Sequence, residues 1–200
     1  VSRAITTILV LMVAYVYSRL RFPSRKFLMN ASLVLGMFPG FMSIIAIYHF
    51  MKAVSLDQTL LALILVYSGG AALNYYIAKG YFDTIPRSLD EAAILDGATN
   101  GTIFWKIILP NAKPVIATTA INAFINPIVD YIFVSVIMKD NYNNFTVAKG
   151  LYTMVDKTNI YEYYTVFCAG AVIVAIPVVL LFIRMQKYYV AGVVGGSVKG

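Results

Sequence analysis

Charged residues are scarce in this sequence, and several residue types that support enzyme chemistry are nearly absent. Charged side chains make up 12% of the 200 residues, and there is one cysteine, one histidine and one tryptophan. A soluble domain carries about a quarter of its residues charged. The shortage of charge, together with 60% hydrophobic residues, excludes an ordinary soluble domain and indicates an integral membrane protein.

The single cysteine and the single histidine exclude several kinds of site. Cys168 lies inside an apolar run, so neither a disulfide framework nor a cysteine-based metal site is expected. An intramembrane enzyme needs convergent groups, such as a histidine cluster or paired acids. His49 and the mid-span Asp130 do not supply them. The sequence therefore predicts no catalytic residues, no metal site and no cofactor bound by this chain.

Five apolar segments predict an all-α, polytopic membrane protein. They cover residues 5–20, 31–51, 60–81, 115–138 and 165–186. Their lengths are close to the roughly 20 residues that a helix needs to cross a bilayer. Ser68-Gly69-Gly70 interrupts the third segment, which favours close helix packing, with a hinge as the alternative. Pro127 predicts a kink in the fourth segment, and Pro177 lies inside the fifth.

The positive charge is concentrated in alternate loops. Although the formal net charge is +7, this distribution is that of an orientation signal, so we expect no nucleic-acid partner. The bias places residues 19–26, residues 79–114 and the C-terminus in the cytoplasm. Residues 52–58 and 139–164 are then outside. Five spans also place Val1 outside, so we expect a sixth span upstream and a chain that is truncated at its N-terminus.

The cytoplasmic loop at residues 84–113 is polar and helix-forming. Ser88 and Glu91 have the spacing of a capping box, and Gly97 permits the turn that ends a first short helix. A second helical piece is expected over residues 99–108, ending at Pro110. The loop also carries apolar residues that need a cover, either the membrane surface or a partner. These are Ala92, Ala93, Leu95, Ala98, Phe104 and Ile107.

The same loop carries a known signature. Glu91-Ala92-Ala93, then Gly97, then Ile108-Leu109-Pro110 resembles the EAA motif of ATP-binding-cassette importer permeases. The resemblance implies a type I importer transmembrane domain over residues 1–200, whose loop is a coupling helix seated on an ATPase subunit. Glu91 would face a basic residue of that subunit. The coupling residues implied are Ser88, Glu91, Ala92, Ala93, Asp96, Gly97, Leu109 and Pro110. Without the resemblance, the loop reads equally well as an interfacial hairpin that links two spans.

Other segments resemble the carbohydrate branch, and specifically the MalG-like maltose/maltodextrin permeases. They are Arg19-Leu-Arg-Phe-Pro-Ser-Arg25, Met37-Phe-Pro39, Gly69-Gly70, the run from Lys79 to Ile85, and the glycine-rich end from Gly195 to Gly200. The resemblance implies a multi-pass protein of the bacterial cytoplasmic membrane. Its implied partners are a MalF-like second permease, a MalK-like ATPase dimer that binds ATP and magnesium, an extracytoplasmic sugar-binding protein and the sugar.

The glycine-rich end does not form an ATP site. Lys199 is followed by Gly200 and not by Ser or Thr, so the phosphate-loop pattern fails. The resemblance implies instead that the cytoplasmic tail at residues 187–200 contacts the ATPase dimer through Gly195, Gly196, Lys199 and Gly200. The alternative from composition is a frayed terminus.

Polar residues recur every four positions in the fourth apolar segment. Asn122, Asn126 and Asp130 therefore share one helix face, and a carboxylate at that depth requires a polar cavity or a partner. One interpretation is a sugar path; the other is hydrogen bonding to the second permease. Rival functions are an importer for another sugar, a polyol or a glycerol-phosphate, and an ion-coupled transporter that uses Asp130.

Overall fold

The computed structural model of the chain describes residues 2–37, 40–69, 72–139 and 141–197, and all of their regular structure is helical. The elements are α1 (Ser2–Arg19), α2 (Arg25–Met37), α3 (Gly40–Ala53), α4 (Leu60–Gly69), α5 (Ala72–Thr84), α6 (Ser88–Leu95), α7 (Asn100–Ile103), the π-helical η1 (Phe104–Ile108), α8 (Leu109–Asn111), α9 (Lys113–Val129), α10 (Ile132–Met138), the 3-10 turn η2 (Tyr142–Asn144), α11 (Val147–Met154) and α12 (Ile160–Ser197). The all-α prediction is confirmed.

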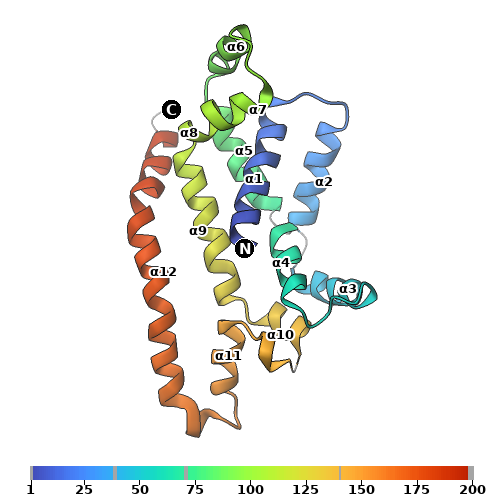
Figure 1. The fold of residues 1–200 in the computed structure, drawn as a ribbon, viewed down its shortest axis with the longest axis vertical. Helices are drawn as coiled ribbons and strands as arrows, with labels where there is room; N and C mark the ends of the chain where they lie inside the picture. The colour runs from blue at the N-terminus through green and yellow to red at the C-terminus, as the bar shows by residue number, and fades with distance from the viewer. Residues whose placement is uncertain (1, 38–39, 70–71, 140, 198–200) are drawn as a thin grey trace.

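Helix α1 forms the centre of the helical bundle. Helices α5, α9 and α4 pack around it (Figure 1). Val10, Ala14 and Ser18 recur every four residues, so they share one face of α1, and all three are buried. The opposite side of α1 is exposed and apolar, with Ile5, Ile8 and Met12. Arg3 and Arg19 lie near the two ends of the helix, away from the middle of a bilayer.

Three of the expected spans are bent helix pairs. The axes of α2 and α3 differ by 106°, those of α4 and α5 by 40°, and those of α9 and α10 by 59°. Within the described residues, length and hydropathy support one span on its own, Ile160–Gln186 of α12, and up to four spans if each bent pair crosses once. Five were expected from the sequence; the difference is α1, which is central in the bundle.

The sequence predicted an interruption at residues 68–70 and a kink at Pro127. The structure has a break at the first position, but the second bend lies three residues after Pro127. Ser68 is buried, but Gly69, which ends α4, is exposed and has no neighbour within 4 Å of where a Cβ would lie, so the close packing predicted at this glycine is wrong. Gly70 lies outside the described residues. The bend expected at Pro127 lies instead at Asp130, because Pro127 is inside α9. The backbone of Asp130 leaves the helix (φ −79°, ψ 101°), and its Oδ1 accepts a hydrogen bond of 3.1 Å from the Phe133 amide at the start of α10.

The loops gather at two ends of the molecule, as the charge pattern predicts. At one end, the side chains of Asn141 and Asn144 donate to the carbonyl of Gln58 at 3.1 and 3.0 Å. This joins the two loops that were predicted to be outside. Helices α6 and α7 lie at the opposite end, beside the C-terminal end of α1 (Figure 1).

Each end has its own apolar cluster. The cluster beside the 84–113 loop contains Val10, Leu11, Ala14, Tyr15, Ala78, Phe82, Ile85, Ala93, Ile103, Phe104, Ile108, Ala112 and Val115. The cluster at the opposite end contains Met51, Ala62, Leu63, Phe133, Val134, Ile137 and Met138. The first cluster contains residues of the loop and of α1, α5 and α9, so the loop packs against the bundle.

Helix α12 packs along α9 and α11 and continues past the expected end of the fifth span. The backbone of the predicted tail is helical up to Ser197, which includes Gly195 and Gly196. Lys199 and Gly200 lie outside the described residues. The C-terminal end of α12 reaches the end of the molecule where α8 lies (Figure 1).

Candidate functional site

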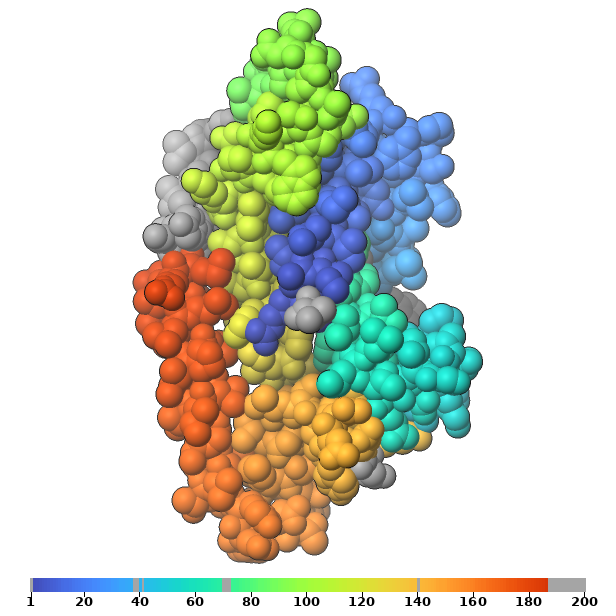
Figure 2. All heavy atoms as spheres, in the orientation of Figure 1, coloured from blue at the N-terminus to red at the C-terminus, as the bar shows by residue number. Residues whose placement is uncertain are grey.

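Helix α6, which carries Glu91, stands out from one end of the molecule (Figure 2). The capping box predicted at its start is wrong: the capping position is Arg87, which already has helical dihedrals, and no side chain caps the helix. Ser88 is the first helical residue, so its hydroxyl is past the position from which it can cap. The turn after Pro86 begins the helix instead. The amides of Asp90 and Glu91 donate to the Arg87 carbonyl at 2.9 and 3.0 Å.

The end of α6 follows the sequence prediction. Gly97 adopts φ +80°, the left-handed region that a side chain disfavours. Its amide donates to the Ile94 carbonyl at 2.9 Å, and the Ala98 amide donates to the Ala93 carbonyl at 2.9 Å. These two bonds form a Schellman motif, which satisfies carbonyls at the helix end. Gly97 therefore determines how sharply the chain reverses.

The second helical piece is longer than predicted. The Thr99 side chain accepts a hydrogen bond of 3.3 Å from the Thr102 amide and caps α7. The chain then continues through η1 and α8, so Pro110 does not end it; Ala112 does, with φ −108° and ψ 22°. A proline ring crowds the carbonyl four residues earlier. The π-helical turns at Phe104–Ile108 are wider than α-helical turns and give the ring room.

The chain itself covers part of the apolar surface of the loop. Ala93 and Phe104 are buried, and the Phe104 ring lies 5.1 Å from the ring of Tyr15 in α1. The prediction that a partner or the bilayer must cover them is therefore wrong for these two residues. Leu95 is 89% exposed and Trp105 is 58% exposed. The exposed tip consists of Glu91, Ala92, Ile94, Leu95, Asp96 and Gly97.

An ion pair holds the buried side of α6 against α1. Arg19 Nε lies 2.9 Å from Asp90 Oδ2, and the two side chains are only 5% and 13% exposed. The Arg19 guanidinium also donates to the Ile85 carbonyl at 2.8 Å. Burial raises the pKa of Asp90 above its ordinary value, although the charges of Arg19 and Arg87 act in the opposite direction.

Further hydrogen bonds join α1 to the start of α6, to α5 and to α7. Arg87 Nη2 donates to the Ser18 carbonyl at 3.2 Å, and the Ser18 hydroxyl donates to Asp83 Oδ1 at 2.6 Å. The Tyr15 hydroxyl donates to the Asn100 carbonyl at 3.2 Å. Sequence reasoning missed these contacts, since it treated Arg19 as an orientation signal only. No local pattern reveals a pairing between residues so far apart in the chain.

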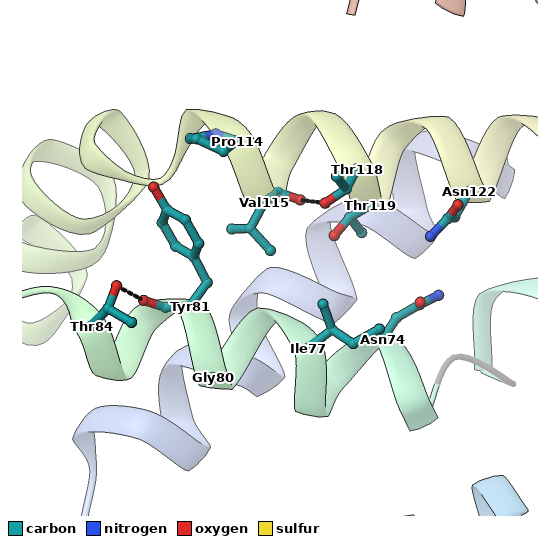
Figure 3. A pocket seen from close by; sticks show the side chains of 10 residues that line it. All are labelled: Asn74, Ile77, Gly80, Tyr81, Thr84, Pro114, Val115, Thr118, Thr119 and Asn122. Atoms are coloured by element: carbon teal, nitrogen blue, oxygen red, sulfur yellow. Dashed lines mark hydrogen bonds between the residues drawn. The ribbon is translucent and has the colours of Figure 1, made fainter. Parts of the chain in front are cut away.

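A cavity of about 420 Å³ lies between α5 and α9. Asn74 and Asn122 reach into the same end of it from the two helices (Figure 3). Its lining also includes Ile77, Gly80, Tyr81, Thr84, Pro114, Val115, Thr118 and Thr119. Asn122 thus lies at a cavity whose lining combines polar and apolar side chains.

A second cavity of about 820 Å³ lies where α9 ends and α10 begins. Asn126 and Asp130 line it, together with Tyr67 and Thr6, and Asn74 lines both cavities. The structure therefore separates the predicted polar face into two cavities that share Asn74. Asn126 is exposed to the second one. Both volumes are in the range of small-molecule sites.

Within the described residues there is no group of three or more His, Cys, Asp or Glu side chains that could hold a metal ion. The two cavities offer amides, hydroxyl groups and one carboxylate. Such groups exchange hydrogen bonds with a polar, uncharged solute. This arrangement suits binding and passage of a solute.

Comparisons with known proteins agree with this description. Residues 6–194 match the family described as "Binding-protein-dependent transport system inner membrane component". The chain is 39% identical over 188 residues to the galactooligosaccharides transport system permease protein GanQ of Bacillus subtilis, covering 94% of this chain and 66% of the relative. It is 37% identical to the maltodextrin transport system permease protein MalD of Streptococcus pneumoniae, covering 100% of this chain and 71% of the relative. It therefore spans about two thirds of the length of such relatives.

The fold also matches a solved structure. A bacterial ABC transporter involved in the import of the acidic polysaccharide alginate contains a chain that superimposes with a TM-score of 0.78. The match covers 93% of this chain and 69% of the other, at 24% sequence identity. It shows that the helices described above have the arrangement of an importer transmembrane chain.

Proposed function

Since this chain belongs to the family of binding-protein-dependent transport system inner membrane components, we propose that it is a permease subunit of an ATP-driven carbohydrate importer. The observation that carries the proposal is the exposed tip of α6, which presents Glu91 and Leu95 at one end of the bundle. The chain itself performs no bond chemistry. Motion driven by ATP elsewhere would be converted into alternating access of the cavities.

The tip suits an ATPase groove for two physical reasons. Leu95 and Ile94 offer apolar surface that the chain leaves uncovered. Glu91 adds a negative charge in the first turn of α6, available to a basic residue of the partner. We assign the docking contact to the exposed coupling residues Ser88, Glu91, Ala92, Asp96, Gly97 and Pro110. Ala93 and Leu109 would support the docking surface by packing the loop on the bundle, since Ala93 is buried and Leu109 is partly buried.

The complete importer would contain four further components. These are a MalF-like second permease, two MalK-like ATPase subunits that bind ATP and magnesium, and an extracytoplasmic sugar-binding protein. The cytoplasmic tail, with Gly195, Gly196, Lys199 and Gly200, would contact the ATPase dimer. The end of α12 points to the same end of the molecule as α6 and α8, which supports this assignment (Figure 1). The complex would lie in the bacterial cytoplasmic membrane, with this chain crossing it several times.

The sugar path would follow the two cavities. Asn122 would serve the first cavity, and Asn126 and Asp130 the second, because amides and carboxylates match the hydroxyl groups of a sugar. The alternative is that the exposed amides of Asn122 and Asn126 bond to the second permease within the membrane. An effect of each asparagine on sugar affinity separates the two.

We propose maltose or maltodextrin as the substrate. Relatives named for maltodextrin and for maltose transport, at 35–37% identity, support this choice. The relative named for galactooligosaccharides supports a galactose-containing oligosaccharide as the alternative. A polyol or a glycerol-phosphate is the third class to test.

The test is uptake by the complete complex in proteoliposomes. The full-length permease, its second permease and ATPase subunits are reconstituted, the binding protein is added, and labelled maltodextrin and galacto-oligosaccharide are compared. We expect ATP-dependent uptake of maltodextrin. Preference for the galacto-oligosaccharide would reassign the substrate. Uptake that persists without the ATPase subunits would contradict an importer of this class and favour ion coupling through Asp130.

A further inference from the structure

We propose that Arg19 and Asp90 form a latch that makes α1 move together with the 84–113 loop, so that motion of α6 reaches the second cavity through α1. This inference rests on the proposed function. Helices α5 and α9 are joined to the loop by the backbone and follow it in any case. Helix α1 has no such connection, so side-chain contacts alone decide whether it follows.

Two contacts of Arg19 join α1 to the 84–113 loop. The Arg19–Asp90 pair is almost completely buried, and Arg19 donates at the same time to the Ile85 carbonyl. A buried pair is screened little by solvent, whereas the pair between Lys79 and Asp83 is more exposed and lies within one helix. Only the Arg19–Asp90 pair connects α6 with α1 by opposite charges among the ion pairs of the described residues.

The other end of α1 touches the second cavity. The Thr6 hydroxyl donates to the Tyr67 carbonyl at 3.2 Å, and Thr6 lines that cavity. Tyr67 in turn donates to Asp130, whose other oxygen accepts from Phe133 at the start of α10. A chain of contacts therefore leads from α6 along α1 to the bend between α9 and α10.

The geometry of α1 suits transmission over that distance. It is one unbroken helix from Ser2 to Arg19. At 1.5 Å per residue, Thr6 and Arg19 are about 20 Å apart along the axis. A continuous helix passes displacement along its axis with little loss, whereas the helix pairs α4–α5 and α9–α10 are bent by 40° and 59°.

The test compares variants in the reconstituted importer, with ATP hydrolysis and sugar uptake measured on the same preparation. Arg19→Ala should keep the ATPase subunits bound and active, since the exposed tip is unchanged, but the sugar moved per ATP should fall about tenfold. The swapped variant Arg19→Asp/Asp90→Arg should recover part of that ratio. Arg21→Ala is the matched control, because Arg21 is an exposed arginine two residues after Arg19, past the end of α1, and it should behave as wild type.

Arg19→Lys covers the case in which Arg19→Ala does not assemble. Lysine keeps the charge beside Asp90 but cannot reproduce the forked guanidinium that also bonds Ile85. We expect an intermediate amount of sugar per ATP. A wild-type ratio in Arg19→Ala, or equal losses of hydrolysis and uptake in Arg19→Lys with an unchanged ratio, would overturn the latch and leave a purely structural role.

A distance measurement separates failure of the latch from failure of the proposed function. Spin labels are placed at Ile8→Cys on α1 and Tyr142→Cys at the opposite end, both exposed positions, in a complex from which Cys168 and any other native cysteine have been replaced. ATP should change this distance in the otherwise wild-type complex and not in Arg19→Ala. If the complex hydrolyses ATP without moving any sugar tested, the substrate class fails, while this distance still decides the latch: an equal change in both proteins would overturn it.

Discussion

The hydroxyl of Tyr67 donates a hydrogen bond of 2.9 Å to Oδ2 of Asp130, while Oδ1 of Asp130 accepts from the Phe133 amide at 3.1 Å. Both oxygens of the one mid-span carboxylate are thus used within the chain. One bond joins α4 to the end of α9, and the other begins α10. Asp130 therefore stabilises the bend beside the second cavity in addition to lining that cavity.

Removing Asp130 should destabilise this bend. Asp130→Ala leaves the Tyr67 hydroxyl without its acceptor and the Phe133 amide without its cap, so we expect a loss of about 1–3 kcal/mol in the free energy of unfolding. Tyr67→Phe removes one bond and should cost about 1 kcal/mol. Thermal unfolding in detergent measures both. A Tyr67→Phe effect larger than that of Asp130→Ala would contradict this account.

Asn126 should matter for the sugar and not for the fold. It is exposed to the second cavity, so Asn126→Ala should leave thermal stability within about 0.5 kcal/mol of wild type. The KM for sugar uptake should rise, because a hydrogen-bonding amide is lost from the path. ATP hydrolysis stimulated by the binding protein is the control. Unchanged uptake with intact coupling would remove Asn126 from the path.

Reversal of charge at Glu91 should break the contact with the ATPase. Glu91 is exposed on α6, so Glu91→Lys should leave the membrane fold intact but release or uncouple the ATPase subunits. Glu162→Lys is the matched control, because Glu162 is an exposed carboxylate in the first turn of α12, outside the coupling residues, and this variant should transport as wild type does. Trp105 is the one tryptophan of these 200 residues and lies in the same loop, so ¹⁹F NMR of fluorotryptophan, with the Trp105 signal assigned by Trp105→Phe, reports docking. Normal transport by Glu91→Lys would show that Glu91 does not take part in docking.

The turn at Gly97 should be sensitive to any side chain. At φ +80° an alanine is strained although the space around the glycine is open, so Gly97→Ala should lose about 1–2 kcal/mol of stability in the loop. Gly101→Ala is the matched control: Gly101 lies in α7 with φ in the ordinary range, and alanine favours helix there. Hydrogen exchange of the α6 amides should accelerate only in the first variant.

The buried charge of Asp90 should make stability depend on pH. Its pKa is raised in the folded protein by burial, so the folded state takes up a proton at a higher pH than the unfolded state. The resulting contribution to stability is fully present below the unfolded pKa and is lost as pH rises through the folded pKa. As pH rises through the folded pKa of Asp90, the Tm of the wild type should therefore fall relative to the Tm of Asp90→Asn. A difference that stays constant or grows with pH would contradict the raised pKa.

The sequence alone determined the class of the protein and the features that depend on neighbours in the chain. Apolar segments of about 20 residues require helices in a membrane, because a helix satisfies its own backbone. The motif around Glu91 identified the family, and the turn at Gly97 followed from the residue type. The charge bias correctly predicted which loops share an end of the molecule, because it depends only on the order of the charged residues along the chain.

Only the tertiary structure decided which segments touch. The start of α6 depends on the turn after Pro86 and not on Ser88, and the bend of the fourth segment lies at Asp130 and not at Pro127. Phe104 is covered by Tyr15, and Asp90 is paired with Arg19. Each outcome depends on residues distant in sequence that packing brings together, and no local propensity encodes which distant partner satisfies a buried charge or covers a ring.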